Sequence, residues 1–171
     1  MTADAHQRAL VLRAQSGDRD AFDALLREIA PPLLRYVARV VGEVAMAEDV
    51  VQETLIAIVR KIEWLNDPNL FRAWAYRIAS RQAFRALKKR RLVEPLDEVD
   101  IGADVTADPW QRERLLASID RLTPASRAVI TLHYLEDMPL SEVAAVLELA
   151  PGTVKSRLAY GLAQLRKDNQ P

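Results

Sequence analysis

Two short amphipathic patterns lie close together in residues 140–158, LSEVAAVLELAPGTVKSRL, and predict two helices joined by a tight turn. Pro151 has a fixed φ that suits the first turn of the second helix. That helix opens with small polar and basic residues, as in a helix-turn-helix that inserts its second helix into the major groove of DNA. From periodicity alone, an ordinary helical hairpin is an equally good interpretation. The apolar positions of the two helices are Leu140, Val143, Ala144, Leu147, Val154, Leu158 and Leu165, which leaves Thr153, Lys155, Ser156 and Tyr160 facing outward.

The composition excludes several classes of protein. A chain of 171 residues can bury a core as one domain or as two small ones, and it has no cysteine for disulfides, thiolate metal sites or a nucleophile. The two histidines, His6 and His133, lack metal-ligand spacing, and there is no glycine-rich phosphate loop or catalytic triad, so neither an enzyme nor a cofactor is expected. The N-terminus is unlike a signal peptide, and no apolar run approaches the ~20 residues of a membrane span. We therefore expect a soluble, cytoplasmic and nearly all-helical protein.

Charge divides the chain into three parts. Residues 1–91 carry 16 Lys and Arg against 11 Asp and Glu, residues 92–110 carry six acids and no base, and residues 111–171 carry eight bases against seven acids. The middle part also has two prolines, one glycine and no helical stripe, which is typical of a linker. We predict an all-α protein of two small helical domains, joined by a flexible acidic linker that screens the basic domain in the free protein.

Local signals predict the first helices of the basic domain. A helix is expected over residues 5–16. Asp18 can cap the next helix, and Gly42 should end it. Between these two positions, Pro31 and Pro32 should bend or restart the helix because proline lacks the backbone N–H that a helix interior needs.

A further helix is expected over residues 45–62, with polar side chains gathered on its exposed side near the N-terminal end. Carboxylates there suit the helix dipole, so a capped and solvated face is the simpler interpretation. A docking surface for a basic partner is the alternative. The polar side chains are Glu48, Asp49, Gln52 and Glu53.

The most unusual helix is expected over residues 71–91, after a turn at residues 64–70 whose Asn, Asp and Pro residues disfavour helix. From Arg72 onward this helix holds eight bases and no acid, and Trp74 and Phe84 project with the bases. A basic stripe with aromatic rings suits single-stranded nucleic acid, because the rings stack on unpaired bases while the cations hold phosphates. The alternative is that Trp74 is a core residue under the turn. The bases that share about 80° of arc are Arg77, Arg81, Arg85 and Lys88.

The chain resembles the extracytoplasmic function (ECF) class of bacterial RNA polymerase sigma factors over residues 15–166. AEDVVQET, at residues 47–54, is similar to the family segment that binds a coiled coil of the polymerase largest subunits. FRAWAYRIA, at residues 71–79, is similar to the helix that opens and reads the promoter minus-ten element. Similarity to the domain that reads the minus-thirty-five element is carried by LTP, YLE and GTVKSRL, at residues 122–124, 134–136 and 152–158.

The resemblance implies an alternative sigma factor, which binds core RNA polymerase and directs promoter-specific transcription initiation without being an enzyme. Its partners would be core RNA polymerase, promoter DNA and an anti-sigma factor, with no small-molecule substrate, no cofactor or metal and no membrane insertion. Polymerase contacts would come from Glu48, Asp49, Gln52 and Glu53. Single-strand contacts at the minus-ten element would come from Trp64, Asn66, Asp67, Asn69, Trp74, Arg77, Arg81, Arg85, Lys88 and Lys89. Duplex contacts at the minus-thirty-five element would come from Thr153, Lys155, Ser156, Arg157 and Tyr160.

Two departures from the family pattern bear on these sites. The turn of the helix-turn-helix has Glu148 where the family usually has glycine, and a left-handed conformation is mildly costly for other residues. Arg85 stands at a position that is acidic in the family, which makes the helix more basic. Two other functions stay open from the residues alone. One is a DNA-binding regulator that uses only the helix-turn-helix, and the other is a helical protein that sequesters a partner.

Overall fold

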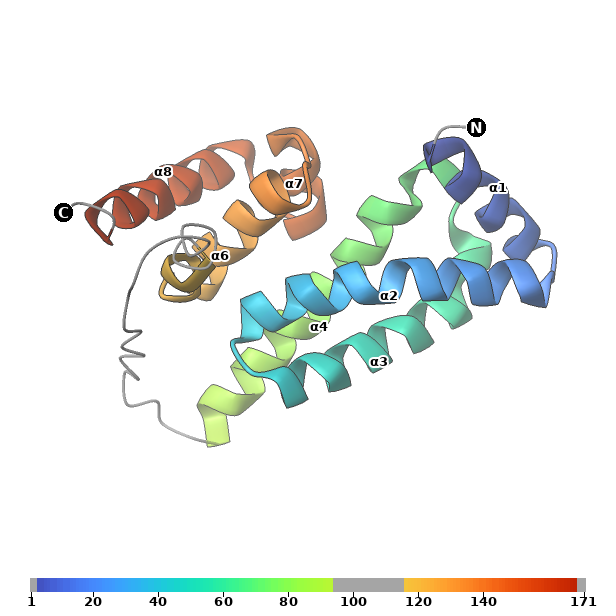
Figure 1. Cartoon of the computed structure of the whole chain (residues 1–171), viewed down its shortest axis with the longest axis horizontal. Coiled ribbons are helices and arrows are strands. Elements are labelled where there is room, and N and C mark those ends of the chain that lie inside the picture. Colours follow the sequence, from blue (N-terminus) through green and yellow to red (C-terminus); the bar gives the residue numbers. More distant parts are fainter. Residues whose placement is uncertain (1–2, 94–115, 169–171) are drawn as a thin grey trace, which may run out of the picture.

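The computed structural model describes residues 3–93 and 116–168, and every regular element within these two stretches is a helix (Figure 1). The N-terminal module (residues 3–93) holds α1 (Ala3–Gln15), α2 (Arg19–Val41), α3 (Val44–Lys61), the 3-10 turns η1 (Ile62–Trp64) and η2 (Pro68–Leu70), and α4 (Phe71–Val93). The C-terminal module (residues 116–168) holds a helical stretch at residues 116–120, α6 (Pro124–Ile130), the π-helical turn η3 (Thr131–Leu135), α7 (Leu140–Leu147) and α8 (Pro151–Asp168). The predicted all-α fold is confirmed.

The predicted linker, residues 92–110, lies almost wholly outside the described residues. α4 continues through Leu92 and ends at Val93, so the basic helix extends past the predicted domain boundary at residue 91. The screening role that we expected of the linker acids concerns residues outside the described part of the chain.

The two ends of α2 follow from local signals. The Asp18 carboxylate accepts a hydrogen bond from the backbone N–H of Ala21 at 3.0 Å, which is the N-cap that the sequence predicts. Gly42 adopts a left-handed conformation with a φ of 75° and donates its N–H to the carbonyl of Ala38 at 2.9 Å. Because other residues are strained at this φ, the glycine determines where α2 ends.

α2 continues through Pro31 and Pro32, so the predicted restart is wrong. Proline in a helix interior costs about 3 kcal/mol through its missing N–H and its clash with the preceding turn. Against this cost, Leu25, Ile29 and Leu33 form one buried face that spans the proline pair. Burial of each such side chain contributes about 1.5–3 kcal/mol, so tertiary packing outweighs the local signal.

The apolar core of the N-terminal module lies between α2, α3 and α4, which pack against one another, while α1 packs on α2 (Figure 1). Its largest fully buried side chains include Tyr36, Phe71 and Tyr76. The same buried cluster extends into the C-terminal module through Leu132 and Val143. The two modules therefore share one core and do not merely touch at their surfaces.

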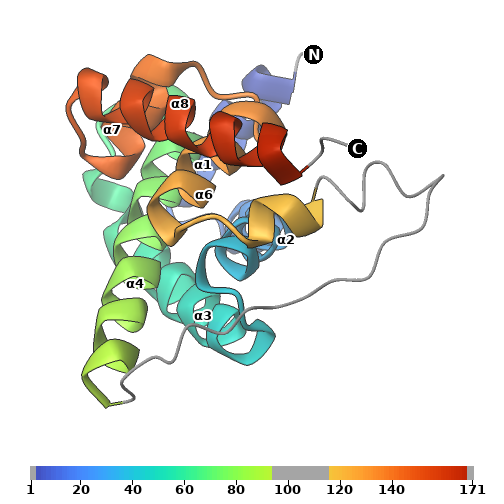
Figure 2. The ribbon, with the colours of Figure 1, turned by 90° about the vertical axis from the view of Figure 1, so that its left-hand side faces the viewer.

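In the C-terminal module, α6 lies between α8 and α2 (Figure 2), and α7 packs against α4. α8 approaches α6 closely at Gly161, because a Cβ atom there would lie 2.5 Å from Cδ1 of Ile130. A glycine permits this approach without displacing the buried isoleucine.

α7 and α8 occupy the residues predicted for the helix-turn-helix. Pro151 opens α8, as its fixed φ indicates. Glu148 ends α7 in a left-handed conformation with a φ of 55° and a ψ of 44°, and its N–H donates to the carbonyl of Ala144. Glu148 is therefore the first residue of the turn between the two helices.

Candidate nucleic-acid and polymerase interface

The turn before α4 is held by two polar side chains. Asp67 Oδ1 accepts hydrogen bonds from the backbone N–H of Asn69 at 2.9 Å and from its Nδ2 at 2.8 Å. Gln15 Nε2 on α1 donates to the carbonyls of Ile62 and Leu65, both at 2.8 Å. Sequence reasoning missed Gln15 because its partners are backbone carbonyls 47 and 50 positions away.

The predicted base-contacting residues of this turn are accessible. Trp64 is 73% exposed, which leaves most of its ring available for stacking. Asn66, Asp67 and Asn69 are also exposed. The turn therefore combines a fixed backbone with an open aromatic surface.

The predicted DNA-binding cations of α4 differ in solvent exposure and in pairing. Arg85, Lys88 and Lys89 are exposed, and none has an acidic partner within the described part of the chain. Arg77 is half-buried. Arg81 is exposed but paired with an acid of the C-terminal module, as described below.

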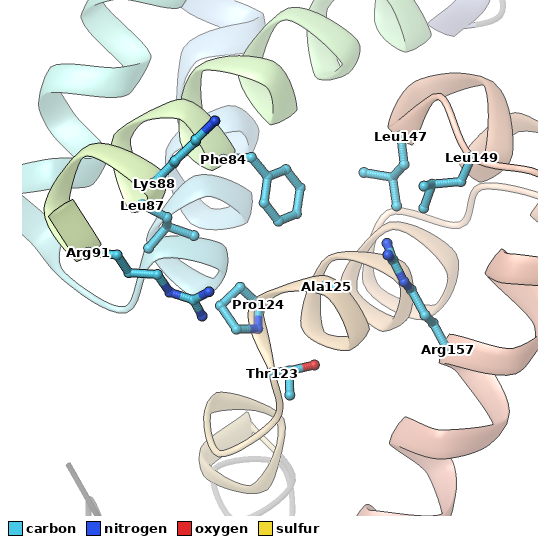
Figure 3. A pocket seen from close by; sticks show the side chains of 10 residues that line it. All are labelled: Phe84, Leu87, Lys88, Arg91, Thr123, Pro124, Ala125, Leu147, Leu149 and Arg157. Carbon is cyan, nitrogen blue, oxygen red and sulfur yellow. The ribbon is translucent and has the colours of Figure 1, made fainter. Parts of the chain in front are cut away.

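Neither of the two rings predicted to stack on bases, those of Trp74 and Phe84, is fully exposed. Trp74 and Phe84 are half-buried and pack against the apolar core. The ring centroids of Trp74 and Phe71 lie 6.1 Å apart. Phe84 projects toward a groove between the two modules (Figure 3). Both rings are therefore partly packed in the core, as one interpretation predicts, and partly exposed, as the other predicts. The ring of Trp64 is the freely accessible one in this region.

A polar cluster that the sequence did not predict joins α4 to the C-terminal module. Glu136 follows η3, and its side chain is 11% exposed. Arg72 donates through Nη2 to the backbone carbonyl of Glu136 and to its Oε2, the latter at 3.3 Å. Tyr76 donates its hydroxyl to the same Oε2, and the Arg72 guanidinium lies 5.6 Å from the Tyr76 ring centroid. Burial, followed by the hydrogen bond to Glu136, raises the pKa of Tyr76 well above its ordinary value.

A second contact ties α4 to the turn of the helix-turn-helix. Arg81 donates through Nε to Oε2 of Glu148 at 2.6 Å and through Nη2 to Oε1. This two-point geometry matches the planar guanidinium to the carboxylate. The hydrogen bonds raise the pKa of Arg81 and lower the pKa of Glu148, and the charge of Arg77 also contributes to the lower pKa of Glu148. A side chain predicted to hold promoter DNA is thus held here by the second module.

A third contact joins α6 to the C-terminal end of α2. Arg127 donates through Nη1 to the carbonyl of Arg39 at 2.6 Å and through Nη2 to the carbonyl of Leu122 at 2.7 Å. A cation at this end of α2 suits the helix dipole, although burial lowers the pKa of Arg127. Arg39 also pairs with Asp120 at 3.2 Å. The contacts between the modules therefore extend along both α2 and α4.

A groove of about 450 Å³ opens between α4 and the C-terminal module (Figure 3). Arg157, a predicted duplex contact, is half-buried and points into this groove from α8 (Figure 3). The other predicted duplex contacts face elsewhere: Lys155, Ser156 and Tyr160 are exposed, and Thr153 is half-buried. The apolar lining of the groove includes Phe84, Leu87, Leu147 and Leu149, and its cations are Lys88, Arg91 and Arg157.

The predicted acidic face of α3 is exposed along its whole length. The three carboxylates have no cation within 4.0 Å among the described residues. The first turn of α3 contains no acid, which weakens the interpretation of these carboxylates as dipole caps. Two apolar side chains that sequence reasoning missed, Ile56 and Val59, continue this face and are 44% and 48% exposed. The exposed polar residues are Glu48, Asp49, Gln52 and Glu53.

Comparison with known proteins places this geometry in a family. Residues 25–93 match the family Sigma-70 region 2, and residues 112–165 match Sigma-70, region 4. The chain is 34% identical over 166 residues to the ECF RNA polymerase sigma factor SigL of Mycobacterium tuberculosis, covering 92% of this chain and 94% of SigL. The chain belongs to the ECF family of sigma factors. The RNA polymerase sigma factor CarQ of Myxococcus xanthus is 29% identical to this ECF sigma factor over 161 residues, covering 91% and 92% of the two chains.

Two solved structures have the same fold as this ECF sigma factor. CnrH, in complex with the cytosolic domain of CnrY, superimposes with a TM-score of 0.70 at 26% identity, covering 95% of this chain and 96% of that chain. The sigma factor RpoE from Bartonella quintana, in complex with the anti-sigma factor NepR, has a TM-score of 0.70 at 23% identity, covering 86% and 95% of the two chains. The latter likeness concerns the fold alone.

The predicted resemblance is confirmed, and with it the function that it implies. This ECF sigma factor directs the initiation of transcription by RNA polymerase. The region 2 match covers the long basic helix, which a regulator acting only through its helix-turn-helix leaves unexplained, so that alternative is not favoured. Among the helices that the structure describes, none has both the length and the apolar character needed to cross a membrane.

Proposed function

We propose that this ECF sigma factor opens promoters with the cations of α4 and reads the upstream duplex with α8, acting as an initiation factor and not as a catalyst. The observation that carries the proposal is the acid-free helix that begins directly after the turn bearing Trp64. Arg85, Lys88 and Lys89 are exposed on this helix and pair with no acid among residues 3–93 and 116–168. From Arg77 to Lys89 the helix rises ~18 Å, so its cations can follow several nucleotides of one strand.

The turn at residues 64–70 is proposed to hold one base extruded from the melted strand. The Trp64 ring can stack on that base, and the side-chain amides of Asn66 and Asn69 can hydrogen-bond its edge. Extrusion costs a few kcal/mol. Stacking of about 1–3 kcal/mol offsets much of that cost. Gln15 supports this site indirectly because it fixes the backbone of the turn before DNA arrives.

The first turns of α8 are proposed to read the minus-thirty-five duplex. Lys155 can pair with guanine edges in the major groove, while Ser156 and Tyr160 hold phosphates that set the register. Thr153 lies at the start of α8, where its hydroxyl can donate a hydrogen bond to a phosphate. Arg157 can join these contacts only when the modules separate, because it points into the groove between them (Figure 3).

The exposed acids of α3, with Ile56 and Val59 beside them, are proposed to dock on a basic and partly apolar surface of core RNA polymerase. We also propose an anti-sigma factor as a partner. RpoE from Bartonella quintana was solved in complex with one, and CnrH with the cytosolic domain of CnrY. Since core RNA polymerase is the partner on which the function depends, we place the protein in the cytoplasm.

Run-off transcription with core RNA polymerase and a library of promoter sequences tests the function. Wild-type protein should give promoter-dependent transcripts. The double variant Arg85→Ala/Lys88→Ala should form open complexes about five- to tenfold less well while still binding core polymerase, because two phosphate contacts are lost. The matched control is Arg27→Ala, an exposed arginine on α2. The absence of a promoter-dependent transcript from every sequence, or an equal defect in the control, would contradict the proposal.

A further inference from the structure

The ion pair between Arg81 and Glu148 lies where the two DNA-reading surfaces meet. Arg81 belongs to the cations of α4, and Glu148 stands in the turn directly before α8. The two residues are 67 positions apart in sequence. Their contact therefore exists only while the C-terminal module is closed onto α4.

Glu148 holds a backbone conformation that glycine adopts more easily, with a φ of 55° and a ψ of 44°. Within the described part of the chain, Asp137 is the other non-glycine residue with a positive φ. Aspartate is enriched in this region because its short side chain bonds to the local backbone, whereas glutamate lacks that advantage. What the longer side chain of Glu148 gains is the contact of both carboxylate oxygens with Arg81.

The neighbours of Glu148 fit the same face of α4. Leu147 and Leu149 are half-buried and line the groove between the modules together with Phe84 (Figure 3). Phe84 lies one helical turn along α4 from Arg81. An acidic side chain flanked by two leucines thus meets an arginine beside a phenylalanine, which makes the contact specific in both charge and shape.

We propose that Glu148 competes with promoter DNA for Arg81. In the free sigma factor, Glu148 occupies the donors of Arg81 that a promoter phosphate takes in the open complex. The proposal rests on the proposed role of α4 in holding the melted strand. A phosphate that binds the Nε and Nη2 edge of Arg81 needs the donors that the Glu148 carboxylate occupies, so the two compete for this edge. Movement of α7 away from α4 releases Arg81, which couples strand binding to the separation of the modules.

The competition biases the equilibrium between closed and open forms but does not prevent opening. The side chains of Arg81 and Glu148 are 59% and 46% exposed, so water and salt weaken their attraction. Loss of one exposed ion pair shifts such an equilibrium by about two- to fivefold. The binding of polymerase can readily exceed a bias of this size.

Binding of a short single-stranded oligonucleotide to the full-length protein at low salt, followed by fluorescence anisotropy, tests the competition. Glu148→Gln should tighten binding about two- to fivefold. Glu142→Gln makes the same charge change on α7 and should have a smaller effect. In an Arg81→Gln background, Glu148→Gln should give no further gain. An equal gain from Glu142→Gln, or a gain that persists without Arg81, would overturn the proposal.

A distance measurement separates this proposal from the proposed function. The chain has no cysteine, so Arg60→Cys and Arg166→Cys place the only two spin labels at exposed positions on α3 and α8. Glu148→Gln should increase the population of long distances about two- to fivefold. An unchanged distance distribution overturns the competition and leaves the proposed function standing. A shift to longer distances without tighter DNA binding rejects the strand-binding role of Arg81, on which the competition rests.

Discussion

Glu136 is the acid whose removal should loosen the contact between the modules most. Its carboxylate is 11% exposed and accepts hydrogen bonds from Arg72 and Tyr76 on α4. Glu136→Ala removes the carboxylate that both donors share. The Tyr76 hydroxyl then loses its acceptor in the contact between the modules, while Arg72 keeps its hydrogen bond to the backbone carbonyl of residue 136.

The free-energy change can be bounded from burial. A buried hydroxyl that loses its acceptor costs about 1–3 kcal/mol. Loss of the ion pair costs less than the 3–5 kcal/mol of a fully buried pair, because Arg72 is 39% exposed and can be hydrated. We expect Glu136→Ala to lower the free energy of unfolding by about 2–4 kcal/mol, which lowers Tm by roughly 5–15 °C for a chain of this length. Tyr76→Phe removes one hydroxyl and should cost about 1 kcal/mol.

Thermal unfolding followed by far-UV circular dichroism measures these changes. The control is Glu142→Ala, which removes an acid from the first turn of α7, where a carboxylate suits the helix dipole and has no cation within 4.0 Å among the described residues. Because Glu136 and Tyr76 share one hydrogen bond, their double variant should be less destabilised than the sum of the single variants. A Tm for Glu136→Ala no lower than that of the control, or strictly additive effects, would refute the reasoning.

Three further predictions concern the core and the turn. Burial raises the pKa of Tyr36 and Tyr76 above the ordinary 10.0, so both contribute fully to stability below a pH of about 10 and lose that contribution as pH rises further. Denaturant unfolding at increasing pH should therefore show that the free energy of unfolding falls more steeply for wild type than for the double variant Tyr36→Phe/Tyr76→Phe. Gly152→Ala should raise the free energy of unfolding by about 0.5–1 kcal/mol, since nothing lies within 4 Å, whereas Gly161→Ala should give no gain because its Cβ would lie 2.5 Å from a buried isoleucine. Gln15→Ala should leave core polymerase binding intact and weaken promoter opening, measured by permanganate reactivity of unpaired thymines, because the turn loses two hydrogen bonds.

For each of these three predictions, a control variant or a stated outcome can contradict the physical reason given. Phenylalanine at Tyr134 and Tyr160, both 52% exposed, controls for the number of tyrosines, and an alkaline loss unchanged in the buried double variant would exclude burial as its cause. Equal gains from the two glycine variants would contradict the close approach at Gly161. Normal promoter opening by the Gln15 variant would mean that the turn does not need support from α1.

The helix ends could be predicted from sequence because each depends on a few adjacent residues. Asp18 and Gly42 cap α2 through contacts within four positions, so a short window contains all the information. The restart predicted at Pro31 and Pro32 is wrong for the same reason. Their effect is local, whereas the buried face that carries α2 past them depends on α3 and α4.

The contacts that close the modules could not be predicted in this way. Arg72 and Glu136 are 64 positions apart, and Arg81 and Glu148 are 67 apart. Sequence comparison with the family pointed to Glu148 as a departure from glycine, and its left-handed backbone is confirmed. Nothing local to Glu148 identifies its partner, because the pairing depends on how the C-terminal module packs on α4.

These pairings also explain how a nearly neutral C-terminal module can present a cation to DNA. Three of its acids, Asp120, Glu136 and Glu148, each pair with an arginine of the N-terminal module, whereas Lys155 faces outward. Opening therefore uncovers a basic surface on one module and an acidic surface on the other. Promoter phosphates neutralise the first but repel the second, so DNA alone offsets only part of the electrostatic cost of opening. Separation becomes favourable when core polymerase holds the modules apart. The contact between the modules therefore couples the binding of the melted strand to the binding of polymerase.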